Sequence, residues 1–312
     1  MPVTGSVGPV AVVVEAVSYT HLDVYKRQRP CRTPPPRLGH MSYPISEARP
    51  PPAYRRGRVW LDWETEFLPW LTGKKTRVIR EEGPIGLAPH WTPGMHMALI
   101  GKTGEGKSTL AVGILKTRKY VLALDPKGED PTLEAGGFTR ILALPPKKKL
   151  PKEIQRDLDE GRPVRLVVGG ASRTREADKK LRTLLEDALE YARQSTGWTV
   201  YADEYQLLAD YRMYGLGPQV ERMQISARSA GISIVTAFQA PAWVPKASTR
   251  QSNIIVAWRT RDEDMVKNIA RAAGRSWKDI GQTMDELPKY HVLVIPDELR
   301  APLMMTSAPK IN

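Results

Sequence analysis

The sequence predicts an α/β fold in which a mainly parallel β-sheet carries helices on both faces. Three observations support this prediction. Short apolar runs that are typical of buried strands alternate with helical patterns along most of the chain. A glycine-rich loop, Gly101–Ser108, lies between one such run and a helix. Four of the runs end in polar residues, as strands do where a parallel sheet binds a ligand at its carboxyl edge.

Length and charge limit the classes of protein to consider. The 312 residues can form one large domain or two small ones. Lys and Arg number 47 against 34 Asp and Glu, a net charge of +13 that favours a polyanionic partner, nucleic acid first, although a basic protein without such a partner is the alternative. Cys31 is the only cysteine, which excludes intrachain disulfides and cysteine metal sites. No apolar run approaches the length of a membrane span, so we expect a cytoplasmic protein.

The first 90 residues are expected to lie outside the main domain. Residues 17–28 resemble a translated sequencing adapter, so residues 1–40 are interpreted as an assembly artefact or a disordered segment. Residues 41–90 are expected to be a Pro- and Arg-rich arm followed by a small accessory segment, in which 76–80 and 83–86 form a β-hairpin. Residues 91–312 then form the main domain.

The loop at 101–108 matches G-x-x-x-x-G-K-[ST], the phosphate-binding P-loop (Walker A), with a strand predicted at 95–100 and a helix at 107–115. Its glycines let the backbone wrap a phosphate chain, and the helix N-terminus supplies positive potential. We therefore expect ATP, with Lys107 on the β- and γ-phosphates and the Ser108 hydroxyl on Mg²⁺. The nucleotide-binding residues are predicted to be Gly101, Lys102, Thr103, Gly104, Glu105, Gly106, Lys107, Ser108 and Thr109.

The elements after this loop alternate in type. The clearest is a helix over 174–194, because Leu and Ala recur there at intervals of three and four residues. The other predicted elements are strands at 120–124, 141–144, 164–168, 199–202, 232–237, 254–258 and 291–295, and helices at 218–230 and 263–273.

Polar residues at three strand ends are candidates for the chemistry. An Asp-Glu pair that closes a strand downstream of a P-loop is the Walker B arrangement: Asp203 would orient Mg²⁺ and Glu204 would polarise the attacking water, with a helix cap as the alternative for Asp203. Gln239 is expected near the γ-phosphate, with a plain strand-end amide as the alternative. For Asp125 and Lys127 a turn role and a site role have equal support.

The order of these motifs resembles the FtsK/HerA superfamily of P-loop ATPases, DNA-pumping motors that include chromosome translocases, conjugative coupling proteins and viral packaging ATPases. The resemblance is carried by Met95–Ser108, Leu124–Gly128, Ala227–Gln239 and Thr249–Arg259, and it spans roughly residues 83–306. It implies a RecA-like core that assembles as a ring, usually a hexamer, with ATP at the subunit interfaces.

The resemblance also implies an arginine finger supplied by the neighbouring subunit. Arg228, 11 residues before Gln239, has the position of this finger in the coupling-protein branch, with Arg222 and Arg250 as rivals and a solvated surface charge as the alternative for each. The chain reads Gln239-Ala240-Pro241 where FtsK itself has Gln-Arg-Pro. This departure, and the lack of the membrane and winged-helix segments of the chromosome translocases, favours a compact motor of a mobile element or virus.

The predicted function is an ATP-driven translocase of double-stranded DNA, working in conjugative transfer or genome packaging with a relaxosome, secretion or capsid partner. The segments 147–152 and 212–217 are candidates for the pore lining. An ATPase for virion assembly or protein export is the alternative. A small-molecule kinase is disfavoured by Glu204, because a water-activating carboxylate would waste ATP, and a non-catalytic scaffold is disfavoured because the hydrolytic residues are all present.

Overall fold

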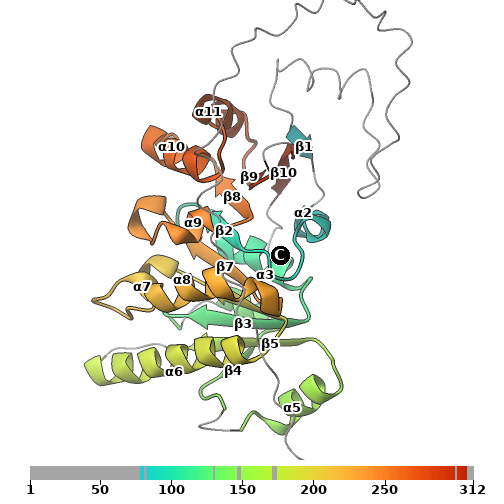
Figure 1. Ribbon diagram of the computed structural model, residues 1–312, viewed down its shortest axis with the longest axis vertical. Coiled ribbons are helices and arrows are strands. Elements are labelled where there is room, and N and C mark those ends of the chain that lie inside the picture. The colour runs from blue at the N-terminus through green and yellow to red at the C-terminus, as the bar shows by residue number, and fades with distance from the viewer. Residues whose placement is uncertain are drawn as a thin grey trace, which may run out of the picture. The chain divides into compact units, whose positions relative to one another are not determined.

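The computed structural model describes residues 78–80, 83–128, 131–145, 149–170, 174–298 and 301–307. These residues form a ten-stranded sheet (Figure 1). Across the sheet the strands are β1 (Val78–Arg80), β10 (Leu303–Ser307), β9 (His291–Pro296), β8 (Ile254–Trp258), β2 (Met97–Ile100), β7 (Ser233–Phe238), β6 (Trp198–Ala202), β3 (Tyr120–Asp125), β5 (Val164–Gly169) and β4 (Thr139–Ile141). The predicted segment 1–40 and residues 41–77 of the next segment lie outside the described residues.

The middle of the sheet is parallel and determines where the site forms. β2 lies between β7 and β8, so that Ile100 pairs with Phe238 on one side and with Ala257 on the other. β6 pairs in parallel with β7 on one side and with β3 on the other. Because these strands run parallel, their carboxyl ends lie at one edge, and the loops that leave this edge can share a ligand.

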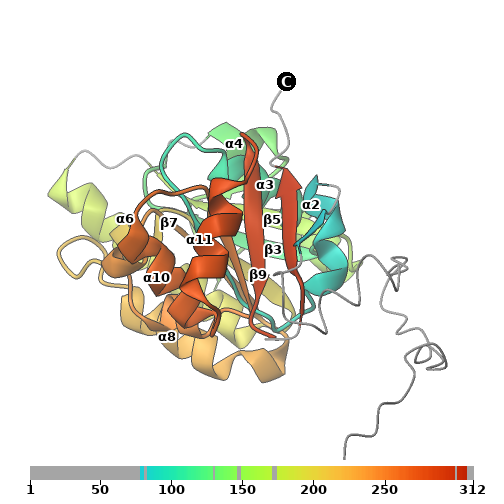
Figure 2. The ribbon, with the colours of Figure 1, turned by 90° about the horizontal axis from the view of Figure 1, so that it is seen from above.

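Helices cover both faces of the sheet (Figures 1 and 2), and the alternation of side chains along a strand accounts for the two layers. In β2, Met97 and Leu99 belong to one apolar core, and Ala98 and Ile100 to the other. The first core is covered by α2 (Gly83–Gly86), α3 (Lys107–Leu115) and α4 (Pro131–Ala135). The second is covered by α5 (Lys152–Asp159), α6 (Arg175–Gln194), α7 (Tyr205–Ala209), α8 (Gly217–Ser226), α9 (Ala247–Arg250), α10 (Glu263–Ala272) and α11 (Trp277–Asp285).

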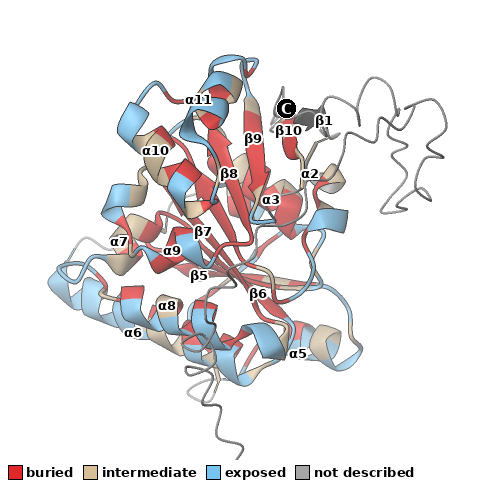
Figure 3. Ribbon diagram, turned by 45° about the horizontal axis from the view of Figure 1, so that its top comes forward, coloured by how far each residue is buried: buried red, intermediate tan, exposed pale blue. Residues whose placement is uncertain are grey.

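The strands are buried while the helices keep a polar outer face (Figure 3). The long helix α6 shows how the sequence sets this pattern. Thr174 caps its first turn by accepting a hydrogen bond from the Ala177 N–H at 3.2 Å, and Leu181, Leu185 and Leu189 face the sheet. No helix in the described ranges is long and apolar enough to cross a membrane.

The predicted fold class is confirmed, with the main strands within two residues of their expected bounds. The predicted hairpin at 76–86 is wrong: β1 pairs in parallel with β10, and residues 83–86 form the single helical turn α2. The strand expected at 141–144 is displaced to Thr139–Ile141, and Leu142 is 75% exposed. The helix expected at 218–230 ends at Ser226 and is followed by a separate 3-10 turn, η4 (Arg228–Ala230).

Candidate nucleotide-binding site

The glycine-rich loop leaves the carboxyl end of β2 and enters α3. Gly104 and Gly106 have φ values of 82° and 89°, a left-handed backbone that favours glycine. Among the described residues, no hydrogen-bond partner is found for the backbone N–H groups of Gly104, Gly106 and Lys107. Unsatisfied N–H groups in such a loop at a helix N-terminus form a binding surface for a phosphate chain.

Trp258, the last residue of β8, supports this loop. Its indole N–H donates a 2.7 Å hydrogen bond to the Glu105 carbonyl, and the Glu105 carboxylate accepts the Lys102 N–H at 2.7 Å. A Cβ at Gly101 would lie 2.9 Å from the indole ring, so the loop can lie against Trp258 only with glycine there. The sequence did not predict a site role for Trp258; the available signal was an aromatic N–H at the carboxyl end of a strand beside β2.

Lys107 is buried, and its ammonium group is held by the loop itself. Nζ donates to the carbonyls of Gly101 at 2.8 Å and Lys102 at 2.9 Å. Burial lowers the pKa of Lys107, whereas the nearby Glu204, Asp203 and Glu105 carboxylates act to raise that pKa. The negative charges of both predicted Walker B residues therefore favour the charged form of Lys107.

Asp203 and Glu204 follow β6 and are both buried. One oxygen of Asp203 accepts the Tyr201 hydroxyl at 2.9 Å and the Glu204 N–H at 3.0 Å, which fixes the carboxylate in place. Glu204 has a φ of 41°, the left-handed region that a non-glycine residue seldom adopts, and it directly precedes α7. A strained backbone of this kind at an acidic residue is characteristic of functional sites.

Two further residues approach the same site from neighbouring strands. Gln239 follows β7, and its Nε2 donates to Thr103 Oγ1 in the loop at 2.9 Å. Lys127 follows β3, and its Nζ lies 2.7 Å from Glu204 Oε1. Asp125, by contrast, closes the turn: it accepts the Gly128 N–H at 2.9 Å. Of the two roles left open for this pair, Lys127 thus contacts the site and Asp125 shapes the turn.

The predicted metal ligands, Ser108 in the first turn of α3 and Asp203 after β6, are half-buried and buried respectively. In the described part of the chain, no three His, Cys, Asp or Glu residues gather in a group that could hold a metal ion. A hydroxyl and a single fixed carboxylate fit a Mg²⁺ ion that takes further ligands from nucleotide phosphates and water. Thr109 is half-buried one residue further along α3.

Arg228 is not brought to this site. It is exposed in η4, before β7 begins, and its carbonyl oxygen would lie 2.7 Å from a Cβ at Gly94, in the turn that precedes β2. Arg228 and Gln239 thus flank opposite ends of β7, whose six residues span roughly 20 Å. Its rival Arg250, in α9 before β8, is at the same amino edge. Of the pore candidates, Lys147 and Lys148 lie outside the described residues.

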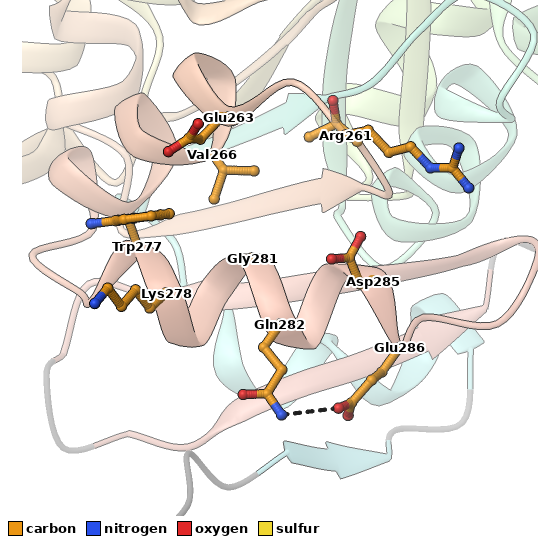
Figure 4. A pocket seen from close by; sticks show the side chains of 10 residues that line it. Arg261, Glu263, Val266, Trp277, Lys278, Gly281, Gln282, Asp285 and Glu286 are labelled. Carbon is orange, nitrogen blue, oxygen red and sulfur yellow. Dashed lines mark hydrogen bonds between the residues drawn. The ribbon is translucent and has the colours of Figure 1, made fainter.

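A hollow of about 690 Å³ lies apart from the predicted site residues, between α10, α11 and the segment after β8. Figure 4 shows the acidic, basic and apolar side chains that line it. None of the predicted nucleotide-binding, metal or catalytic residues is among them. The predicted phosphate-binding residues thus lie in the loop after β2 and not in this hollow.

No protein-family model matches the chain, and no curated protein does so either. Among solved structures, the chain is similar to the genome packaging NTPase B204 of Sulfolobus turreted icosahedral virus 2 in complex with sulfate, with a TM-score of 0.50 and 15% identity over 71% of this chain and all of B204. VirB4 of Thermoanaerobacter pseudethanolicus matches with a TM-score of 0.47 and 10% identity over 69% of this chain and 89% of VirB4. The pCW3 conjugation coupling protein TcpA matches with a TM-score of 0.42 and 16% identity over 69% of this chain and 60% of TcpA.

At these identities the likeness concerns the fold. The B204 match agrees with the fold that the resemblance in motif order implies. It covers the whole of B204, and it supports a P-loop core built on the RecA-like plan. The activity of this chain is inferred from its own residues.

Proposed function

We propose that this chain is an ATPase of the FtsK/HerA type, and that it converts ATP hydrolysis into movement along double-stranded DNA. The observation that carries the proposal is that Gln239, after β7, hydrogen-bonds to the glycine loop that contains Lys107, while Asp203 and Glu204 follow β6, the next strand of the sheet. The same set would be unnecessary in a protein that binds nucleotide without cleaving it.

In the proposed reaction a water oxygen bonds to the γ-phosphorus while the bond from that phosphorus to the β–γ bridging oxygen breaks, which releases ADP and inorganic phosphate. Glu204 accepts the proton of the water. Lys107 exchanges the loop carbonyls of Gly101 and Lys102 for phosphate oxygens, and Gln239 orients groups at the γ-phosphate. When bound, Mg²⁺ would neutralise phosphate charge beside Ser108 and Asp203.

The place of Arg228 supports a head-to-tail ring. An arginine that flanks the amino end of β7 cannot reach the loop at the carboxyl edge of its own sheet. It could reach the loop of a neighbouring copy whose carboxyl edge faces it, and a heterologous contact that repeats around an axis closes a ring. The proposed finger then stabilises the charge that develops on the transferring phosphoryl group. Six subunits are expected because the resemblance to the FtsK/HerA superfamily implies a ring that is usually a hexamer.

Double-stranded DNA is the proposed polymer. The chain carries a net charge of +13, which suits phosphate contacts that do not depend on sequence. A solved structure with a matching fold is named a genome packaging NTPase, and this supports packaging as the process, with conjugative transfer as the other process considered. A capsid, secretion or relaxosome component is then the expected partner.

The test is ATP hydrolysis with and without long duplex DNA, at low salt and at high salt. We expect hydrolysis to be stimulated by DNA at low salt, and the stimulation to fall steeply as salt rises because phosphate contacts release counterions. Lys107→Ala is the matched control and should abolish nucleotide binding. Hydrolysis that ignores DNA at low salt would contradict the translocase proposal and favour an ATPase that acts on virion or export proteins.

A further inference from the structure

A lysine on the turn after β3 contacts the carboxylate proposed to activate water. Lys127 Nζ lies 2.7 Å from Glu204 Oε1. The two side chains differ in freedom: that of Lys127 is 49% exposed, whereas that of Glu204 is 12% exposed. The lysine can therefore change partners at its solvent side, while the carboxylate stays in the site.

The backbone before Lys127 is fixed at two positions. The preceding Asp125 carboxylate is buried and pairs with Arg140 at 3.1 Å. The Pro126 carbonyl accepts the hydroxyl hydrogen of buried Tyr214 at 3.1 Å. Any change of partner by Lys127 thus involves its four-carbon side chain and not a movement of the turn.

Both oxygens of Glu204 have donors in this arrangement. Oε1 pairs with Lys127, and Oε2 accepts a hydrogen bond from the Gln206 amide. A general base needs a free lone pair within hydrogen-bond reach of the water, and the two donors occupy this position on each oxygen of the carboxylate. The observed ion pair is therefore a resting arrangement of the base.

The positive charge of Lys127 also acts on the ammonium group of Lys107. The two charges lie close enough for Lys127 to add to the lowering of the Lys107 pKa that burial causes. A γ-phosphate beside Lys107 would remove this repulsion. It carries more negative charge than a carboxylate, and lysine is a frequent point-charge ligand of phosphate.

We propose that Lys127 binds the γ-phosphate of ATP and, by leaving Glu204, frees that carboxylate to accept the proton of the attacking water. This inference rests on the proposed ATPase function and assigns a further residue to its site. ADP lacks the γ-phosphate, so it leaves the Lys127–Glu204 pair closed. The base is then available only when there is a bond to cleave.

The experiment compares the Kd of a non-hydrolysable ATP analogue, AMPPNP, with that of ADP by calorimetry. Lys127→Met keeps the length of the side chain and removes its charge, and Lys127→Gln repeats the change with a polar group. We expect AMPPNP to bind about tenfold or more weakly, as loss of a charged hydrogen bond gives, with ADP changed less than about twofold. Lys119→Met, at the exposed amino end of the same strand, is the control and should change neither Kd.

The same comparison in a Glu204→Gln variant separates two explanations of weaker AMPPNP binding: loss of a phosphate contact made by Lys127, and an effect that acts only through Glu204. In Glu204→Gln the ion pair is absent, and the Lys127→Met change should still weaken AMPPNP about tenfold. If Lys127→Met does not weaken AMPPNP binding in the Glu204→Gln variant, the proposal is overturned. Equal weakening of AMPPNP and ADP would also overturn it, because Lys127 would then only maintain the structure of the turn. A wild-type protein that binds neither nucleotide would instead refute the proposed ATPase function, so the two failures are distinguishable.

Discussion

Gln239 Nε2 donates a 2.9 Å hydrogen bond to Thr103 Oγ1, which joins the end of β7 to the middle of the glycine loop. β7 is the strand inserted between the loop strand β2 and the acidic strand β6. Gln239 and η4, which contains Arg228, thus lie at the two ends of the same strand.

Gln239→Ala should slow ATP turnover by about 10²-fold or more while leaving the Kd for ADP within about twofold, because the amide is proposed to act at the γ-phosphate and not at the rest of the nucleotide. Steady-state hydrolysis and ADP binding by calorimetry are the measurements. Thr103→Val removes the partner hydroxyl and serves as a comparison. A tenfold loss of ADP affinity in Gln239→Ala would instead assign the amide to holding the loop together.

Arg228→Ala should lower turnover by about 10³-fold without changing nucleotide binding, as arginine fingers supplied in trans do. Mixing this variant with Glu204→Gln should restore part of the activity, because one interface type then combines an intact Arg228 with an intact Glu204. The mixing ratio should be varied and hydrolysis measured at each point. Activity no higher than the sum of the two separate variants would refute a finger that crosses an interface.

Gly169→Ala should destabilise the fold by about 3 kcal/mol, since the added Cβ would lie 2.0 Å from the Asp125 carbonyl oxygen on the neighbouring strand. The turn that carries Lys127 starts at Asp125, so hydrolysis should fall as well. Gly170→Ala is the matched control, because its Cβ meets no described atom within 4 Å. Urea unfolding of the two variants measures the difference, and equal midpoints would contradict the packing between β3 and β5.

His96 should make the protein less stable in acid. It is buried, its Nδ1 accepts the Ile234 N–H at 3.0 Å, and its Nε2 donates to the Gln224 carbonyl at 2.9 Å. Burial lowers its pKa from the usual 6.5, the hydrogen bond to Gln224 opposes this, and the charge of Arg228 lowers the pKa further. The unfolded chain therefore binds the proton more readily, so stability is complete above about pH 6.5 and is lost as the pH falls below it.

Urea unfolding between pH 7.5 and 5.5 tests this dependence. We expect the free energy of unfolding to fall by at most about 1.4 kcal/mol per pH unit from this one group. His96→Gln, whose amide can make both hydrogen bonds without titrating, should show a smaller slope than the wild type. His90→Gln, which changes an exposed histidine, is the control variant. A slope that is the same in His96→Gln and the wild type would rule out this histidine as the cause.

The parts of the fold and site that the sequence could predict are those determined by local pattern. The apolar run at 97–100, the glycines of the loop and the acidic pair after β6 each require particular residue types in consecutive positions. Parallel topology then brings Gln239 to the loop, because strand ends meet at one edge.

The rest depends on contacts between distant segments, which one sequence does not display. β1 pairs with β10 because the chain returns to that edge of the sheet. The sequences of β10 and α11 are short, and in isolation they resemble loops. Trp258, at the end of β8, supports the loop that leaves the neighbouring strand β2. The ion pair of Lys127 with Glu204 joins residues that are 77 positions apart. Such pairings follow from the register of the sheet and not from any local motif.

The parallel pairing of Val78 with Leu303 has a consequence for how the protein is made. β1 leaves the ribosome before its partner and cannot pair until β10 has been translated, and closing so long a loop carries an entropic cost. A nascent chain that stalls before β10 would present the bare flank of β9 to other polypeptides. Translation of β10 therefore also protects that flank.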